Sequence, residues 1–174
     1  MPTKTTTPSD TEVRVSRAFN APARLVWRAY TEPELMQRWM LGPPGWTMPV
    51  CEMDVKPRGK FRWRWQNIES GKEFGFHGEY REIEPFTRIV HTEHYDPGDV
   101  GDDMGSGCLI TFALEEAGGS TTMITSMKFN SKAERDAALS TGMTDGMEMG
   151  YQRLDRIFAA ADEPSVLETG QRGI

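Results

Sequence analysis

Polar and apolar residues alternate along much of the chain, most clearly between residues 60 and 66. Phe61, Trp63 and Trp65 occupy every second position there, with charged or polar residues between them. A period of two is typical of a β-strand with one buried face. The same criterion, with turn residues between the segments, predicts seven strands, at 12–19, 50–55, 61–68, 73–84, 88–95, 108–114 and 121–129.

Other segments repeat apolar residues at intervals of three and four, which is the helical period. Between residues 23 and 39 this period lies on both sides of Pro33, a residue favoured at the first position of a helix, so two short helices are expected. A capping box at Ser131 and Glu134 begins a longer helix that is predicted to reach residue 161, with an interruption near Gly142. The layout is therefore one strand, two short helices, six strands and a closing helix.

The closing helix carries a stripe of glycines beside a stripe of methionines. Gly142, Gly146 and Gly150 are spaced by four, next to Met143 and Met147. A glycine inside a helix costs about 1 kcal/mol relative to alanine, so a compensating feature is expected. Either the helix approaches the sheet closely at this stripe, or a ligand occupies the space beside it. The sequence leaves both explanations open.

Residues 11–161 are predicted to form a single domain, with loose tails at 1–10 and 162–174 that lack a periodic apolar pattern. No apolar run approaches the roughly 18 residues of a membrane span, and the first tail has no apolar segment of the secretory kind. Cys51 and Cys108 fit no zinc or redox spacing and are expected to be free thiols. A cytoplasmic protein is therefore expected.

The formal net charge is −6, which disfavours binding to nucleic acid. Lys60, Arg62 and Arg64 form a local basic row interleaved with aromatic residues, as in some proteins that bind single strands. On a strand whose other face is aromatic, such a row is more simply the solvated face. The expected oligomeric state is a monomer or a weak homodimer.

Nine short motifs, spread in order over most of the chain, resemble those of the SRPBCC (START/Bet v 1-like) superfamily. Within it, the resemblance is to the bacterial branch named after the activator of Hsp90 ATPase homologue 1, and it spans residues 13 to about 161. The motifs are Val26-Trp27, Thr31-Glu32-Pro33-Glu34-Leu35, Trp39, Gly42-Pro43, Trp46, Asp54, Gly59, the stretch 78–85, and Gly142-Met143 with Gly146.

The resemblance implies an α+β helix-grip fold, in which a curved antiparallel sheet of about six to seven strands wraps around a long C-terminal helix. Two short helices follow the first strand, and a cavity lies between sheet and helix. Two positions depart from the family pattern. Arg58-Gly59 stands where two glycines are usual, so the turn there is expected to be rebuilt, and Met40 stands where a second Trp is usual.

Relatives in the superfamily bind lipids, sequester antibiotics, cyclise polyketides or assist a chaperone, and the fold does not decide among these functions. The first hypothesis is non-covalent binding of a small hydrophobic or aromatic molecule, lipid-like or polyketide-like, with Trp39 and Trp46 as gates at the mouth of the cavity. The ten residues predicted to contact this ligand are Trp39, Trp46, Trp63, Trp65, Phe74, Phe76, Tyr80, Met143, Met147 and Tyr151.

Catalysis is the alternative, as a cofactor-free cyclase or hydrolase in which His91 acts with Glu93 or Tyr80. A third hypothesis is a stress-response protein that interacts with a chaperone. The three histidines show no metal-ligand spacing, and no phosphate-binding or dinucleotide-binding glycine motif is present, so neither a metal nor a cofactor is predicted.

Overall fold

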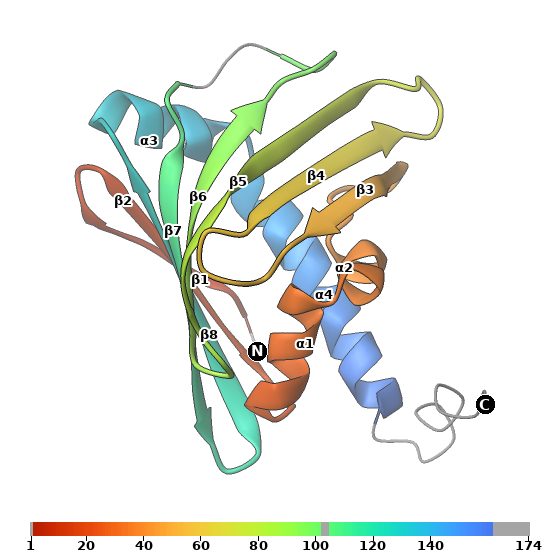
Figure 1. Cartoon of the computed structure of the whole chain (residues 1–174), viewed down its shortest axis with the longest axis vertical. Helices are drawn as coiled ribbons and strands as arrows, with labels where there is room; N and C mark the ends of the chain where they lie inside the picture. Colours follow the sequence, from red (N-terminus) through yellow and green to blue (C-terminus); the bar gives the residue numbers. More distant parts are fainter. Residues whose placement is uncertain (1, 102–104, 162–174) are drawn as a thin grey trace.

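The computed structural model describes residues 2–101 and 105–161, and these residues contain eight strands and four helices (Figure 1). The strands are β1 (Lys4–Ser9), β2 (Glu12–Phe19), β3 (Trp46–Met53), β4 (Lys60–Asn67), β5 (Glu73–Glu84), β6 (Arg88–Asp96), β7 (Cys108–Ala117) and β8 (Ser120–Phe129). The helices are α1 (Ala23–Thr31), α2 (Pro33–Trp39), α3 (Lys132–Ser140) and α4 (Met143–Ala161). The predicted tail at 162–174 lies outside the described residues.

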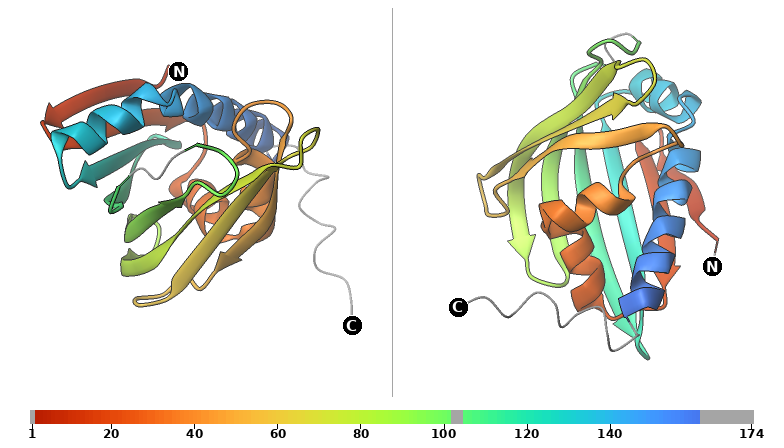
Figure 2. Two further views of the ribbon diagram at one scale, coloured as in Figure 1. Left: turned by 90° about the horizontal axis from the view of Figure 1, so that it is seen from above. Right: turned by 90° about the vertical axis from the view of Figure 1, so that its right-hand side faces the viewer.

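All eight strands form one antiparallel sheet in the order β1-β2-β8-β7-β6-β5-β4-β3. The sheet is curved and not closed, so β1 and β3 remain its two edges. Figure 2 shows the sheet curling around one side of the molecule, with α4 running along the open side and α1 and α2 beside it. The predicted α+β helix-grip architecture is confirmed.

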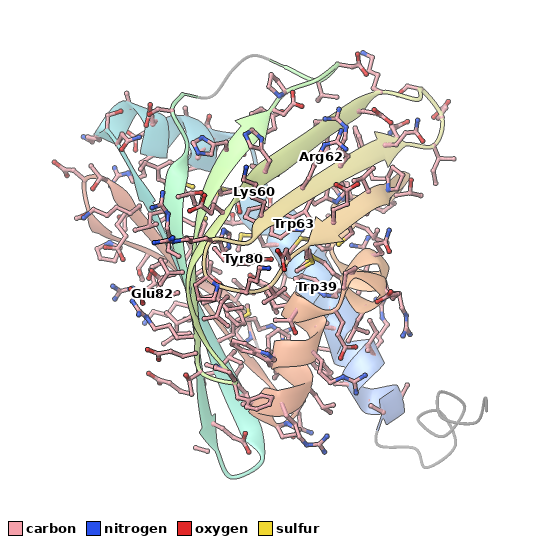
Figure 3. All side chains as sticks on the ribbon, in the orientation of Figure 1. Trp39, Lys60, Arg62, Trp63, Tyr80 and Glu82 are labelled. Atoms are coloured by element: carbon pink, nitrogen blue, oxygen red, sulfur yellow. The ribbon has the colours of Figure 1, made fainter. Side chains whose placement is uncertain are left out.

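The alternating pattern of β4 produces the two faces of the sheet. Phe61, Trp63 and Trp65 are all at least 94% buried, whereas Lys60 before them and Arg62 between them are exposed (Figure 3). Burial of three large aromatic side chains contributes several kcal/mol in favour of this register. Lys60 and Arg62 of the basic row are thus solvated, whereas the Arg64 side chain is only 15% exposed and pairs with Asp96 at 2.7 Å.

The prediction of a loose tail at residues 1–10 is wrong for Lys4–Ser9, which forms β1 and accounts for the eighth strand. β1 pairs with β2, with Lys4 opposite Ser16, and Ser9 accepts a hydrogen bond through its carbonyl from Arg135 Nη1 at 2.6 Å. Every β1 residue is exposed, so no apolar alternation marks the strand in the sequence. Backbone pairing to a neighbouring strand stabilises it instead.

The helix boundaries follow the predicted signals. Pro33 begins α2, and the Ser131 hydroxyl accepts a hydrogen bond from the Glu134 N–H at 3.1 Å at the start of α3. Gly142 has φ +77° and separates α3 from α4, so it lies between helices and not inside one. β3 begins at Trp46, earlier than predicted, with an irregular register around Pro49, as an edge strand allows.

The turn before β4 retains a left-handed backbone without the usual pair of glycines. Arg58 has φ +68°, a conformation that strains a residue with a side chain. Gly59 cannot be replaced, because a Cβ there would lie 1.8 Å from the Asp54 carbonyl oxygen. Tyr80 holds the turn through two backbone hydrogen bonds of 2.8 Å, to the Arg58 N–H and the Gly59 carbonyl.

A buried arginine joins the sheet to α4. Arg17 in β2 is 3% exposed, and its Nη1 and Nη2 atoms donate to the two carboxylate oxygens of Asp155 at 2.9 and 2.5 Å. Glu148, about two turns earlier on the same face of α4, lies 3.5 Å from the same guanidinium. The fork geometry satisfies a charge that would otherwise be costly to bury.

Asp155→Asn is expected to destabilise the protein by about 2 kcal/mol, because the buried guanidinium loses its paired charge. Urea unfolding at neutral pH measures the change. The matched control is Glu12→Gln, which removes the carboxylate of the exposed Arg14–Glu12 pair and is expected to cost under about 0.5 kcal/mol. Equal effects of the two substitutions would mean that Glu148 alone supports Arg17.

Candidate functional site

A cavity of about 550 Å³ lies between the concave face of the sheet and α4. This volume is within the range of sites that hold small organic ligands, about 300–1,000 Å³. Nine of the ten residues predicted to contact a ligand line it: Trp39, Trp46, Trp63, Trp65, Phe74, Phe76, Met143, Met147 and Tyr151. Their contact with a ligand stays a prediction.

Tyr80 does not line this cavity. Its side chain is 2% exposed and borders a separate void of about 20 Å³, together with Met36 and Ile89. The backbone register shifts between Tyr80 and Glu82, and Tyr80 packs under the short helices at the end of the sheet away from Phe74. The prediction that Tyr80 lines the ligand cavity is therefore wrong.

Cross-strand aromatic pairs build the sheet side of the cavity. Trp65 stands opposite Phe74 and Trp63 opposite Phe76 in the pairing of β4 with β5. The rings of Trp65 and Phe74 stack at 5.2 Å between centroids, with 12° between their planes. In such pairs each ring limits the rotation of its neighbour, so the aromatic wall of the cavity on β4 and β5 is flat and rigid.

Four aromatic residues that the sequence did not predict also line the cavity: Tyr30, Tyr95, Phe112 and Phe129. Tyr95 extends the β5 wall, with its ring 5.3 Å from that of Phe76. Alternation along β6 could have found it, because it stands two positions after Glu93 on the same face. Tyr30 packs 4.2 Å from Phe112, a contact between α1 and β7 that spacing along the chain does not indicate.

The glycine stripe of α4 serves two different purposes. A Cβ on Gly150 would lie 3.3 Å from Trp39, so this glycine permits close packing of α2 against α4. A Cβ on Gly146 would meet no atom of the described residues within 4 Å, and Gly146 lines the cavity. Close packing therefore explains Gly150, although the neighbour is α2 and not the sheet. Occupation of the space beside Gly146 by a ligand stays a prediction.

Trp39 is a wall residue and not a gate. It is 3% exposed, and its indole N–H donates to the Ala29 carbonyl at 2.8 Å, which fixes the ring. The prediction that it gates the mouth is wrong, because a hydrogen-bonded and buried indole cannot swing outward. Trp46 is only partly buried and packs edge-on against Phe74 at 5.2 Å.

His91 is a neutral imidazole in the cavity wall. It is 7% exposed, and burial lowers its pKa to about 4. Its Nδ1 lies 3.1 Å from the Thr92 carbonyl oxygen, which favours the tautomer with the proton on Nδ1 and leaves Nε2 as an acceptor. A group with so low a pKa is a weak general base at neutral pH.

Glu93 lies two positions further on the same strand and also lines the cavity. Burial raises the pKa of its carboxyl to about 7. Cys108, a free thiol directly opposite on β7, has a raised pKa because it too is buried and because Glu93 lies nearby. Of the three predicted catalytic residues, Glu93 alone has a pKa suited to proton transfer near neutral pH.

The predicted dyad is not assembled by direct contacts. Among residues 2–101 and 105–161, no hydrogen bond or ion pair joins His91 to Glu93 or to Tyr80. The Tyr80 ring centroid is 6.0 Å from that of His91, and within the described structure its buried hydroxyl has no hydrogen-bond partner. Burial raises the pKa of Tyr80 as well, so it stays protonated at neutral pH. The structure brings the three residues near one another without a proton relay.

The described residues contain neither a candidate metal site nor a candidate membrane-spanning helix. No group of three or more His, Cys, Asp or Glu side chains in them could hold a metal ion. No helix in that part of the chain has the length and apolar character needed to cross a membrane.

A curved, open sheet that wraps around a C-terminal helix, with an aromatic cavity between them, defines this protein as a helix-grip protein. Comparison with known proteins supports the same fold. The profile described as Activator of Hsp90 ATPase homolog 1-like protein matches residues 20–159, and the chain belongs to this family. Comparison with curated proteins gives no match.

Solved structures from several bacteria share the fold. A Rhodobacter sphaeroides protein is 28% identical with a TM-score of 0.83, and the alignment covers 91% of this chain and 99% of that one. A Nitrosomonas europaea protein is 22% identical with a TM-score of 0.76, covering 90% and 99%. An AHSA1-like protein from Aeromonas hydrophila is 17% identical with a TM-score of 0.62, covering 87% and 96%.

Proposed function

We propose that the protein binds a small hydrophobic or aromatic molecule non-covalently in the cavity between the sheet and α4. The single observation that carries the proposal is a space of about 550 Å³ at a point where a close-packed interior would have none. The wall is mostly apolar, so transfer of an apolar molecule from water into this space is favourable. A lipid-like or polyketide-like molecule supplies the missing contacts.

The chemistry of the wall supports the same ligand class. Flat rings on β4 and β5 offer stacking surfaces, and Met143 and Met147 on α4 offer flexible thioethers that adapt to an irregular guest. Gly146 adds room on the helix side. This combination favours binding of an apolar body over recognition of a sugar or a nucleotide.

Catalysis by His91 with Glu93 or Tyr80 has weaker support. His91 has a pKa of about 4, Tyr80 lies outside the cavity, and Glu93 has no positioned partner among the described residues. The chaperone hypothesis rests on the name of the family alone.

Titration with N-phenyl-1-naphthylamine, a neutral probe that fluoresces in apolar surroundings, tests the proposal. We expect saturable binding at one probe per chain, with quenching of tryptophan emission, because four of the five tryptophans line the cavity. The protein is first extracted with organic solvent and refolded, so that a co-purified molecule cannot block the site. Absence of saturable binding to the refolded protein would overturn the proposal.

A further inference from the structure

The charged groups on the cavity wall are all of one sign. Glu93 on β6 and Asp145 in the first turn of α4 line it, and no Lys or Arg lines it within the described residues. Asp145 is exposed at the N-terminus of the helix, whereas Glu93 is half-buried on the inner face of β6, two positions from the buried His91. The cavity therefore has a carboxylate inside and another near the surface, and no cation to balance either.

No positively charged group of the described residues lies beside the Glu93 carboxylate to balance its negative charge. The groups facing it from the packed elements are His91 on β6, Cys108 on β7 and, beyond Cys108, Glu134 on α3. None of these is positively charged at neutral pH, since His91 has a pKa of about 4 and Cys108 has a raised pKa. In the part of the chain that the structure describes, Glu93 has no ion pair or hydrogen bond through its carboxyl. A half-buried carboxylate with no cation beside it is a favourable place for the positive group of a ligand.

The aromatic walls suit a cation as well as an apolar body. Tyr95 stands two positions from Glu93 on the same strand, and its ring packs against Phe76 at 5.3 Å and Phe74 at 6.2 Å. The faces of such rings attract ammonium groups, most strongly where water is excluded. Carboxylate and ring faces thus offer complementary contacts to one positive head group.

We propose that the ligand of this cavity is a cationic amphiphile, whose apolar body lies among the aromatic and methionine side chains and whose amine or quaternary ammonium head lies at Glu93. This inference rests on the proposed function. Asp145 provides the same sign of charge near the surface and attracts the cation toward the site. Fatty acids and other apolar anions are disfavoured, because two carboxylates and no cation line the described wall.

The proposal predicts a pH dependence of a definite sign. A bound cation stabilises the ionised form of Glu93 and so lowers its pKa below the value of about 7 in the free protein. Affinity for a permanently charged ligand should therefore rise between pH 5.5 and pH 8, and affinity for a neutral ligand should not. His91 and Cys108 keep their charge across this range, so they do not contribute.

Displacement of N-phenyl-1-naphthylamine by decyltrimethylammonium, 1-decanol and decanoate tests the proposal. At pH 8 we expect the ammonium compound to bind at least tenfold more tightly than decanol, and decanoate to bind most weakly. Glu93→Gln should reduce the tenfold preference to threefold or less and abolish its pH dependence. The matched control is Glu115→Gln, the same change at an exposed position of β7, which should keep both.

Each failure has a separate signature. Equal binding of the ammonium compound and decanol, tighter binding of decanoate, or a preference that survives Glu93→Gln would overturn the cation proposal while the hydrophobic cavity stands. If the probe itself does not bind the refolded protein, the proposed function fails, and the cation proposal fails with it.

Discussion

Gly146→Phe is expected to weaken binding of N-phenyl-1-naphthylamine at least a hundredfold without loss of stability. The Cβ position at residue 146 is free of described atoms within 4 Å and faces the cavity, so a phenyl ring there occupies the space of the ligand. Replacing a helical glycine by phenylalanine also favours the helix by about 0.3 to 0.5 kcal/mol. Most substitutions that abolish ligand binding also destabilise the folded protein. Gly146→Phe should abolish binding alone.

Two control variants on α4 show whether position or size matters. Gln152→Phe adds the same ring at an exposed position and should leave binding unchanged. Gly150→Ala places a Cβ 3.3 Å from Trp39 and should destabilise the protein, although the added group is small. Probe binding by Gly146→Phe at the affinity of the unmodified protein would mean that the cavity is not the binding site.

His91→Gln and Glu93→Gln are expected to change the pH dependence of stability in opposite directions. Burial lowers the pKa of His91 from 6.5 to about 4, so its contribution to stability is present above pH 6.5 and is lost as the pH falls toward 4. Burial raises the pKa of Glu93 from 4.5 to about 7, so Glu93 destabilises the folded state increasingly as the pH rises from 4.5 to 7. Each effect amounts to about 3 kcal/mol over its range.

Urea unfolding between pH 4.5 and 7.5 separates the two contributions. Relative to the unmodified protein, Glu93→Gln should gain about 2 to 3 kcal/mol of stability as the pH rises, and His91→Gln should lose a similar amount. Any cost of burying glutamine is constant with pH and does not affect these slopes. Curves for the two variants that run parallel to that of the unmodified protein would contradict the burial assigned to both residues.

Local patterns in the sequence predicted most of the fold. Alternation along β4 placed Trp63 and Trp65 on the inner face because the pleat has a period of two, and Pro33 and Ser131 marked helix starts through local backbone chemistry. β1 was missed because its exposed residues show no apolar period, and its order comes from pairing with β2. Such pairing has no local signal in the sequence.

The sequence predicts those features of the site that depend on a single strand or helix, and it does not predict those that depend on contacts between elements. Which face a side chain occupies follows from its own strand, and nine predicted residues do line the cavity. What covers that face depends on distant elements. Tyr80 is inward but lies beside Met36 of α2. A Cβ added at Gly150 would contact Trp39, whereas a Cβ added at Gly146 would have no described atom within 4 Å. The pKa of Glu93 likewise depends on burial contributed by other strands and helices.

Native mass spectrometry of the protein purified gently from its own host tests the central claim most directly. The account predicts a stoichiometric adduct that dissociates when the protein unfolds, and that proves on extraction to be an apolar molecule. A mass without adduct, which also stays unchanged when excess N-phenyl-1-naphthylamine is added, would contradict it.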